Sequence, residues 1–202
     1  MKPKDDLKLY IITPSICRNA LVRTCKSVHS QTYKNWEHII LFDEVENDKI
    51  NNFLEKIPYK PTIERKSWKN FGNGQRHDAW NLVPEDSLIT YMDDDDYYKD
   101  SDCFNKIINK FQNSNIDVVF WAGIRYGEFF NHKPPRANHT MSNQFAHYKY
   151  DSNNNPIQWD FCPNRNQSPG RDAMFIDRIV KSFNYSHIDD PLVVVEKSNR
   201  GL

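Results

Sequence analysis

Several features that would place this chain in a specialised class of proteins are missing from its 202 residues. The four cysteines are scattered with no Cys-x-x-Cys pair, which argues against a zinc site and against a disulfide framework. No apolar run approaches the ~20 residues that a membrane helix needs. Basic and acidic residues both number 27, so no net charge draws the chain toward nucleic acid.

The amino terminus, Met1 to Asp6, lacks the basic segment and apolar core of a signal peptide. Together with the scattered cysteines, which suit a reducing compartment, this predicts a cytoplasmic protein without a transmembrane segment or a nucleic-acid partner. Aromatic residues make up 13% of the chain, which favours a folded, ligand-binding protein over disorder. Since a domain usually takes roughly 100–200 residues, we expect a single domain over residues 1–202.

The most informative stretch is Leu88 to Asp96. Leu88 to Met92 has the apolar character of a buried strand, and it ends in the four carboxylates Asp93–Asp96. Adjacent carboxylates repel one another, so a fold that gathers them needs a counter-charge. Mg2+ is usually held by one or two carboxylates plus substrate phosphates, and open α/β sheets bind ligands outside the carboxyl ends of their strands. The stretch therefore indicates a metal–diphosphate site, with a solvated acidic turn as the alternative.

Strand and helix patterns alternate along the first half of the chain. The spacing predicts strands over residues 9–13, 37–42, 62–65 and 88–92. It predicts helices between them, one starting near residue 19 with Asn19 as its cap, and others over 50–57 and 75–82. Such alternation is typical of right-handed βαβ units, and so of an α/β fold with a mostly parallel sheet.

The second half is less regular. A helix is predicted over residues 104–111, capped by Ser101 or Asp102, followed by a strand over 116–122. A last helix is predicted over 173–183 and a last strand over 192–195. Residues 125–170 show no regular pattern, and a long irregular stretch in a domain is usually a binding loop or a lid.

Polar residues at one edge of the predicted sheet supply what a nucleotide needs. Asp43 follows the second predicted strand, Arg76 lies in a predicted helix, and Asp93–Asp96 follow the fourth strand. They offer an acceptor for a base N–H, a donor for phosphates and carboxylates for a metal. A turn or capping role for Asp43 and a surface position for Arg76 are the alternatives.

At this point the sequence resembles a known family. The segments Ile11–Pro14, Ser27–Ile40, Phe42–Asp43, Arg76 and Tyr91–Asp96 together resemble the family 2 glycosyltransferases with the GT-A fold. The run Ser-Val-x-x-Gln-Thr-Tyr-Lys-Asn-Trp-Glu is the most specific part. The resemblance is clear over residues 8 to 98 and fades after that.

The resemblance implies a single Rossmann-like GT-A domain, with a mostly parallel central sheet flanked by helices. Residues 1–98 would bind a nucleotide diphosphate sugar, with UDP as the expected nucleotide, and residues 99–202 would bind the acceptor. The reaction would be metal-dependent transfer of the sugar to a hydroxyl with inversion, and the cofactor would be Mn2+ or Mg2+. Whether the acceptor is a glycan, a lipid-linked molecule or a protein stays open.

For the nucleotide sugar, the resemblance assigns six positions. Thr13 and Pro14 would border the base, Asp43 would accept a hydrogen bond from it, and Arg76 would lie beside the base or the diphosphate. Asp93 and Asp94 would approach the ribose and the metal.

For the metal and the chemistry, the resemblance implies four positions. Asp95, together with Asp93, would ligate a metal that bridges the diphosphate, and His187, which precedes the last strand, would also reach it. Asp172, at the head of the last helix, would be the catalytic base. A helix cap is the alternative for Asp172, and a surface or capping position is the alternative for His187.

Two further functions remain open at this stage. A sugar nucleotidyltransferase would want a glycine-rich basic first loop, and Thr13 to Arg18 contains no glycine. The other is a non-catalytic carbohydrate- or metal-binding module. Trp121, Trp159 and Tyr126 could offer flat faces to sugar rings or could be ordinary core residues.

Overall fold

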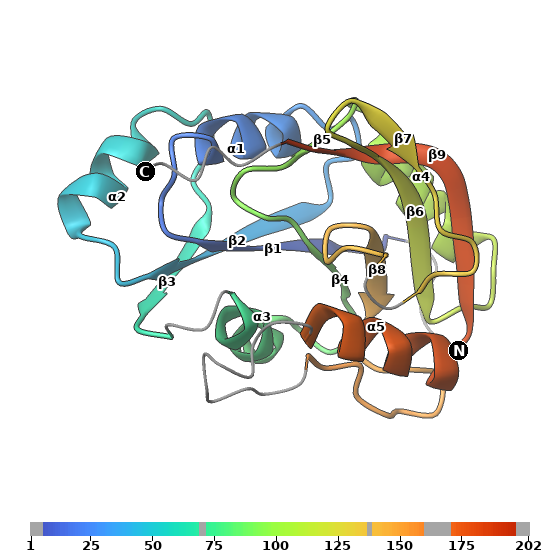
Figure 1. Ribbon diagram of the computed structural model, residues 1–202. Helices are drawn as coiled ribbons and strands as arrows, with labels where there is room; N and C mark the ends of the chain where they lie inside the picture. The colour runs from blue at the N-terminus through green and yellow to red at the C-terminus, as the bar shows by residue number, and fades with distance from the viewer. Residues whose placement is uncertain (1–5, 69–71, 137–138, 160–170, 197–202) are drawn as a thin grey trace.

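A nine-stranded mixed sheet organises the computed structural model, which describes residues 6–68, 72–136, 139–159 and 171–196 (Figure 1). The strands lie in the order β3-β2-β1-β4-β8-β6-β9-β5, and β7 pairs with β6. The predicted α/β class with a mostly parallel sheet is therefore confirmed.

The first half forms the parallel part of the sheet, as its alternation predicts. The strands are β1 (Leu9–Ser15), β2 (Trp36–Asp43), β3 (Thr62–Lys66) and β4 (Leu88–Tyr91). The helices are α1 (Leu21–His29), α2 (Asn47–Leu54) and α3 (Asn73–Ala79), and a 3₁₀ turn over Trp80–Leu82 extends α3.

The second half adds strands of both directions to the same sheet. These are β5 (Tyr97–Tyr98), β6 (Val118–Arg125), β7 (Glu128–Phe130), β8 (Phe145–Tyr148) and β9 (Tyr185–Val195). The helices are α4 (Cys103–Gln112) and α5 (Arg171–Ser182). β8 runs antiparallel between β4 and β6, while β9 is parallel to β6.

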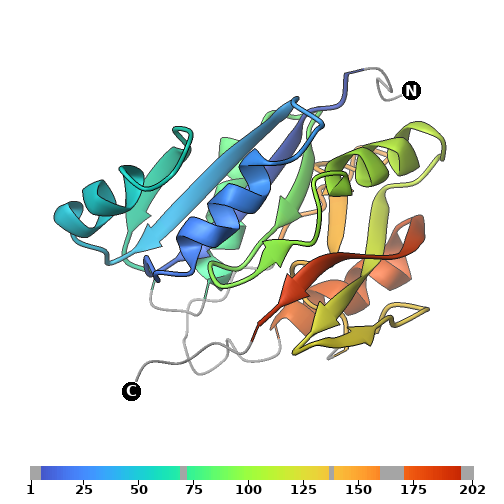
Figure 2. The same cartoon turned by 90° about the horizontal axis from the view of Figure 1, so that it is seen from above.

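Helices cover both faces of β1, which explains why every residue of that strand is buried. On one face, Leu9 and Ile11 pack with α1 and α4. Figure 2, from above, shows both helices on the same face of the sheet. On the other face, Tyr10 and Ile12 pack with α3 and α5. The sheet thus separates two apolar layers and leaves the carboxyl ends of its parallel strands open for a site.

The structure corrects several local predictions. Asn19 does not cap α1, because the helix begins at Leu21 and Ala20, with a helical backbone and no side-chain cap, takes the N-cap position. Asp102 does occupy the N-cap position of α4, again without a side-chain cap bond.

The irregular stretch over residues 125–170 contains the two short strands β7 and β8, and residues 160–170 lie outside the described part. The last strand is longer than predicted, because Asp189, Asp190 and Pro191 interrupt its apolar pattern where its register with β6 shifts. Within the described residues, no helix combines the length and apolar character required to span a membrane.

Gln31 explains part of the most specific sequence segment. Its side chain is fully buried, and its Nε2 donates to the carbonyls of Ser27 at 3.0 Å and Asp100 at 2.7 Å. Its Oε1 accepts from the backbone N–H of Phe104 at 3.0 Å, one of the donors that a helix start leaves unpaired. One amide therefore joins the end of α1 to the start of α4, and so holds the segment that follows the four aspartates.

We expect Gln31→Ala to lower the free energy of unfolding by about 2–4 kcal/mol, since it leaves buried backbone groups unpaired at ~1–3 kcal/mol each. Urea unfolding of the purified protein measures this. The control is Ser30→Ala, which removes an exposed hydroxyl bonded to the same Ser27 carbonyl and should cost less than about 0.5 kcal/mol. Equal losses in both variants would contradict the role given to Gln31.

Candidate functional site

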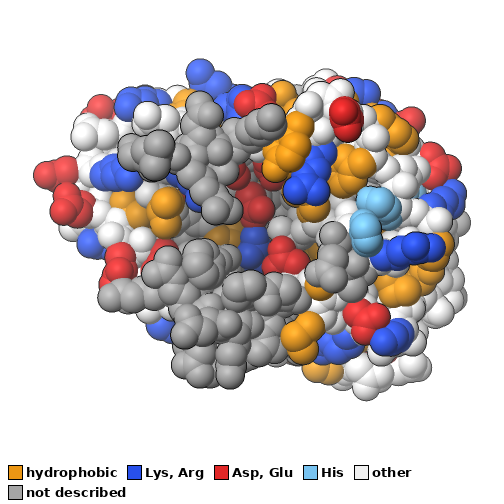
Figure 3. Space-filling view, in the orientation of Figure 1, with side chains coloured by type: hydrophobic (Ala, Val, Ile, Leu, Met, Phe, Trp, Pro, Cys, Tyr) orange, Lys and Arg blue, Asp and Glu red, His pale blue; other side chains and the backbone are white. Residues whose placement is uncertain are grey.

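The candidate site lies where the carboxyl ends of β1, β2 and β4 meet. Because these strands are parallel, the segments after them share one edge of the sheet. The segment after β4 carries Asp93–Asp96, and β1 ends at Ser15 and is followed by Ile16 to Arg18. Figure 3 shows a hollow on this face, lined by acidic side chains with a basic group among them.

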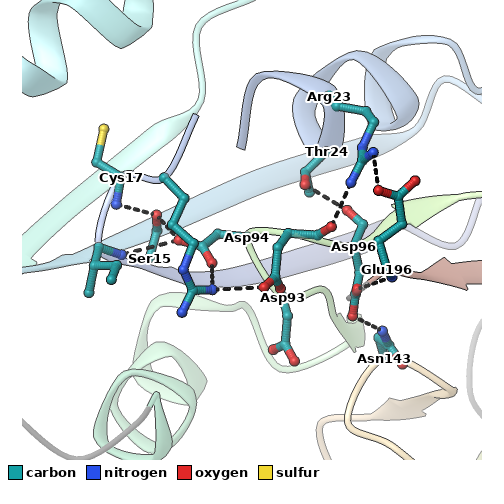
Figure 4. Close-up of polar contacts among 12 residues, drawn as sticks. Ser15, Cys17, Arg23, Thr24, Asp93, Asp94, Asp96, Asn143 and Glu196 are labelled. Carbon is teal, nitrogen blue, oxygen red and sulfur yellow. Dashed lines mark hydrogen bonds and ion pairs between the residues drawn. The ribbon is translucent and has the colours of Figure 1, made fainter. Parts of the chain in front are cut away.

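Asp94 fixes the segment after β1. It is buried, and its Oδ2 accepts from Ser15 Oγ at 2.7 Å and from the backbone N–H of Ile16 at 3.2 Å. Its Oδ1 accepts from Arg18 Nη1 at 2.5 Å. Burial raises the pKa of Asp94, while Arg18 and Ser15 act in the opposite direction. Both carboxylate oxygens are thus engaged within the protein, as the orientation of Asp94 toward Ser15 in Figure 4 illustrates.

Asp95 lies closer to the surface, with 18% of its side chain exposed. Its Oδ2 is 3.1 Å from Arg18 Nη1, and its backbone carbonyl accepts from Arg23 Nη2 at 2.9 Å. Burial raises the pKa of Asp95; Arg18 opposes this, and the charges of Asp93 and Asp94 add to it. An additional cation here would relieve that repulsion.

Asp96 holds separate segments of the protein together. It is buried, and Figure 4 shows it turned toward Asn143 and Glu196. Its Oδ2 accepts from Asn143 Nδ2 at 2.6 Å, its Oδ1 from the backbone N–H of Glu196 at 3.3 Å, and its carbonyl from Thr24 Oγ1 at 2.6 Å. Burial, with the charges of Asp93 and Asp95, raises the pKa of Asp96 to about 8. Asp96 therefore joins α1, β9 and the segment before β8.

Arg76 brings α3 into the site. It is buried, and its Nη2 forms an ion pair with Asp93 and lies 3.3 Å from Ser142 Oγ. Its guanidinium carbon lies 5.2 Å from the centre of the Trp159 ring. Burial alone would lower the pKa of Arg76, but the charges of Asp93 and Asp172 outweigh it and raise the pKa.

Gly72 makes room for this arginine. Its backbone is left-handed, with φ of +84°, and a Cβ placed there would lie 2.8 Å from Arg76 Nη1 and 3.1 Å from Pro14 Cβ. Glycine thus satisfies both the backbone and the close approach at this position. Pro14 and Arg76, which the resemblance assigned to the same nucleotide sugar, thus lie on either side of Gly72.

Asp172 lies in the first turn of α5 and is half-buried. Burial raises its pKa, Arg76 lowers it, and Asp93 raises it. Arg76 and Asp93 are in contact, and the charge of Asp172 acts on the same group, although the three residues come from α3, from the segment after β4 and from α5. A carboxylate, a guanidinium and a second carboxylate can together bind a charged ligand and exchange a proton with it.

Two other predicted positions are engaged in the protein itself. Asp43 ends β2 and is half-buried, and its Oδ1 accepts from the backbone N–H of Trp68 at 2.8 Å. Thr13 is fully buried, with its Oγ1 2.8 Å from His38 Nε2. In this structure a ligand therefore cannot reach Thr13.

The predicted metal contact of His187 requires correction. Tyr97, close to the aspartates, pairs with Val194 near one end of β9, whereas His187 lies near the other end. Because β9 bulges between them, His187 and Val194 pair with Phe120 and Ile124 of β6, four residues apart, which corresponds to about 13 Å at ~3.3 Å per residue. The side chain of His187 is nearly buried and lies 3.4 Å from Asp189 Oδ1, and burial lowers its pKa. The position of His187 along the chain had suggested that it lies near the aspartates, but β9 carries it away from them.

Among the three aromatic residues considered for sugar contacts, Trp121 and Trp159 are buried core residues. Tyr126, at the turn between β6 and β7, is 50% exposed. Its backbone N–H donates to the carbonyl of Val195, next to Glu196 and so to Asp96. The turn that carries Tyr126 therefore lies at the rim of the site.

The sequence reasoning missed the arginines that neutralise the aspartates. Arg18 contacts Asp94 and Asp95, and Arg23 contacts the Asp95 carbonyl and forms a 2.7 Å ion pair with Glu196. The signal lies in the sheet pairing, because Arg18 follows a strand that runs parallel to and beside β4. The requirement for a counter-charge was recognised, but it was assigned entirely to a metal.

The described residues contain no group of three or more His, Cys, Asp or Glu side chains arranged to hold a metal ion. Asp93 and Asp95, which are 34% and 18% exposed, are the aspartates of the run that reach solvent. Two carboxylates fit a hard divalent cation whose coordination is completed by substrate phosphates. The donor set therefore fits Mn2+ or Mg2+ together with a diphosphate ligand.

Comparisons with known proteins bear on the family and the fold. A family model described as glycosyl transferase family 2 matches residues 10–169, well beyond the part where the sequence resemblance is clear. No curated protein matches the chain significantly.

Among solved structures, S. aureus TarS in complex with UDP-GlcNAc has a TM-score of 0.73 at 15% identity, covering 96% of this chain and 59% of the other. The mannosyltransferase PcManGT from Pyrobaculum calidifontis, in complex with GDP-Man and Mn2+, has a TM-score of 0.67 at 13% identity, covering 100% and 59%.

A 4-diphosphocytidyl-2C-methyl-D-erythritol synthase from Anaerococcus prevotii has a TM-score of 0.57 at 15% identity, covering 92% and 88%. At these identities the three structures show a common fold. The chain spans 37% of a longer TarS structure and about three fifths of the TarS complex and the mannosyltransferase.

The different surroundings of Asp95 and Asp96 predict different effects on stability. Asp96→Ala leaves the buried Asn143 amide and the Glu196 N–H unpaired, so we expect a loss of about 1–3 kcal/mol in the free energy of unfolding. Asp95→Ala removes a partly exposed carboxylate and should stay within about 0.5 kcal/mol of the parent. Chemical denaturation of both variants without added metal measures this, and a reversed order would show that the two roles are misassigned.

Proposed function

Because the chain belongs to glycosyl transferase family 2, we propose that it transfers a sugar from a nucleotide diphosphate sugar to an acceptor hydroxyl. The observation that carries the proposal is the ion pair of Arg76 with Asp93 in the run of aspartates at the carboxyl ends of the parallel strands, and the charges of both act on Asp172. UDP is the proposed nucleotide, and its support is the similar TarS structure that contains UDP-GlcNAc.

The donor would lie across the ends of β1, β2 and β4. Asp43 would accept a hydrogen bond from the base, and Pro14 would border it. Arg76, already close to Asp93, would face the diphosphate as well as the carboxylates, since a guanidinium pairs well with phosphate oxygens. Thr13 is left out of the proposed pocket because it is fully buried.

Asp95 and Asp93 would hold Mn2+ or Mg2+, which when bound neutralises the leaving diphosphate as a Lewis acid. The support is chemical: both carboxylates are partly exposed, and repulsion from neighbouring charges contributes to the raised pKa of Asp95. Asp94 would position the segment after β1 and would take no direct part, because both its oxygens are engaged.

Asp172 would act as the general base. It would take the proton of the acceptor hydroxyl while the hydroxyl oxygen bonds to the sugar carbon and the bond to the diphosphate breaks, giving inversion. Arg76 supports this role, because its charge lowers the pKa of Asp172 against the effect of burial and so favours the ionised form. The acceptor would approach over residues 99–202, past the rim that includes Tyr126.

A nucleotidyltransferase is the less favoured function. The loop after β1 would have to present free backbone donors to a triphosphate. Instead, Asp94 accepts from the N–H of Ile16 and Ser15 Oγ accepts from the N–H of Cys17 at 2.7 Å. The backbone N–H groups of Ile16 and Cys17 are therefore already bonded within the protein and are not available to a triphosphate.

For the donor site, we expect the parent protein to bind UDP more tightly with Mn2+ than without it, and we expect Asp95→Ala to lose that dependence. Calorimetric titration with UDP, with and without MnCl2, measures this, and a screen of nucleotide sugars for diphosphate release identifies the donor. The control is Asp86→Ala, an exposed carboxylate before β4 that should leave binding unchanged. Unaltered UDP and Mn2+ binding by Asp95→Ala would place the metal elsewhere.

For the base, Asp172→Asn keeps the size and polarity of the side chain but cannot take a proton. We expect transfer to fall by about 10²–10⁴-fold while UDP binding and melting temperature hold, because a general base contributes to the rate by this range. Single-turnover transfer with the identified donor and acceptor measures it. Asp177→Asn, on the exposed side of the same helix, is the control, and comparable activity in both variants would remove Asp172 from the chemistry.

A further inference from the structure

Arg18 occupies the position beside Asp95 that the proposed function gives to a divalent cation. One nitrogen, Nη1, lies 2.5 Å from Asp94 Oδ1 and 3.1 Å from Asp95 Oδ2. A guanidinium and a divalent ion on the same carboxylate repel each other at such distances. The two cations therefore compete for Asp95.

We propose that Arg18 is an exchangeable counter-cation of the donor site. It neutralises Asp95 while no divalent ion is bound, gives up that carboxylate when the ion binds, and then contacts the diphosphate of the nucleotide sugar. This inference rests on the proposed function and adds to it a residue with two successive partners.

The geometry explains why Arg18 can release Asp95 without leaving the site. Its contact with Asp94 is the shorter of the two, and Asp94 is buried and further held by Ser15 and the Ile16 N–H. With Asp94 as the remaining anchor, the guanidinium stays next to Asp95. A planar guanidinium with several donors suits a diphosphate there better than a point charge.

The backbone around Arg18 is held by hydrogen bonds, while its side chain is partly open to solvent. Lys49 Nζ donates to the carbonyl of Ile16 at 3.1 Å, and the N–H of Cys17 donates to Ser15 Oγ. The Arg18 side chain itself is 42% exposed. The exchange therefore requires a change of side-chain rotamer and no movement of the loop.

Arg23 provides a matched comparison. It also lies beside Asp95, but it contacts the backbone carbonyl, pairs with Glu196 and lies 4.4 Å from the centre of the Tyr97 ring. Removing Arg23 takes away a nearby positive charge without freeing the Asp95 carboxylate. A purely long-range effect of charge would therefore appear in both arginine variants, and a direct competition in Arg18 alone.

The test is calorimetric titration of the parent protein, Arg18→Ala and Arg23→Ala, first with MnCl2 alone and then with UDP at saturating MnCl2. We expect Arg18→Ala to bind Mn2+ about tenfold more tightly than the parent and UDP about tenfold more weakly, a change of ~1.4 kcal/mol each. Arg23→Ala should change both affinities by less than about threefold. Arg18→Lys, which keeps a cation, should lie between the parent and Arg18→Ala, and it serves if the alanine variant folds poorly.

The outcomes separate the two proposals. Equal Mn2+ affinities in the parent and the Arg18 variants would overturn the exchange while leaving metal binding intact. An equal gain in Arg18→Ala and Arg23→Ala would reduce it to long-range charge and overturn it too. Unchanged UDP affinity in Arg18→Ala would remove the contact with the diphosphate. Absence of Mn2+ binding in every protein would overturn both the exchange and the metal part of the proposed function.

Discussion

Repulsion among four adjacent carboxylates is the constraint around which this site is arranged. The fold relieves it in three ways: Arg76 pairs with Asp93, Arg18 pairs with both Asp94 and Asp95, and Asp96 has a raised pKa and neutral hydrogen-bond donors. Segments after β1, in α3 and before β8 are all held to this run by these contacts. The charge of the run therefore organises the sheet edge as well as any ligand.

The front half of the fold could be predicted because its signals are local. Leu9 to Thr13 and Leu88 to Met92 are continuous apolar runs, and such runs alternating with amphipathic helices permit few arrangements. β8 could not be found this way, since a four-residue strand has too few residues to show a period. The last strand was predicted too short for a different reason. The apolar pattern that marks it does not extend back through Asp189 and Pro191.

Only part of the candidate site could be expected from the sequence. Arg76 and Asp93, both assigned to the nucleotide sugar, are in contact. Thr13 was assigned through the family resemblance and His187 through its order along the chain, and neither records which face of a strand a side chain takes or how far a strand runs. Arg18 was overlooked because a surface arginine has no distinctive pattern in one sequence, and its meaning comes from the parallel pairing of β1 with β4.

The division of labour within Asp93–Asp96 also affects how the run can be altered or compared. Four identical letters suggest redundancy, yet each has its own partners, so deleting any one of them in frame gives the same shortened sequence and moves its neighbours into surroundings built for another. A related chain with three aspartates could be aligned here with the gap at any of four places, all scoring alike. Only the partners, such as an amide opposite the last carboxylate or an arginine opposite the first, would tell which aspartate is missing.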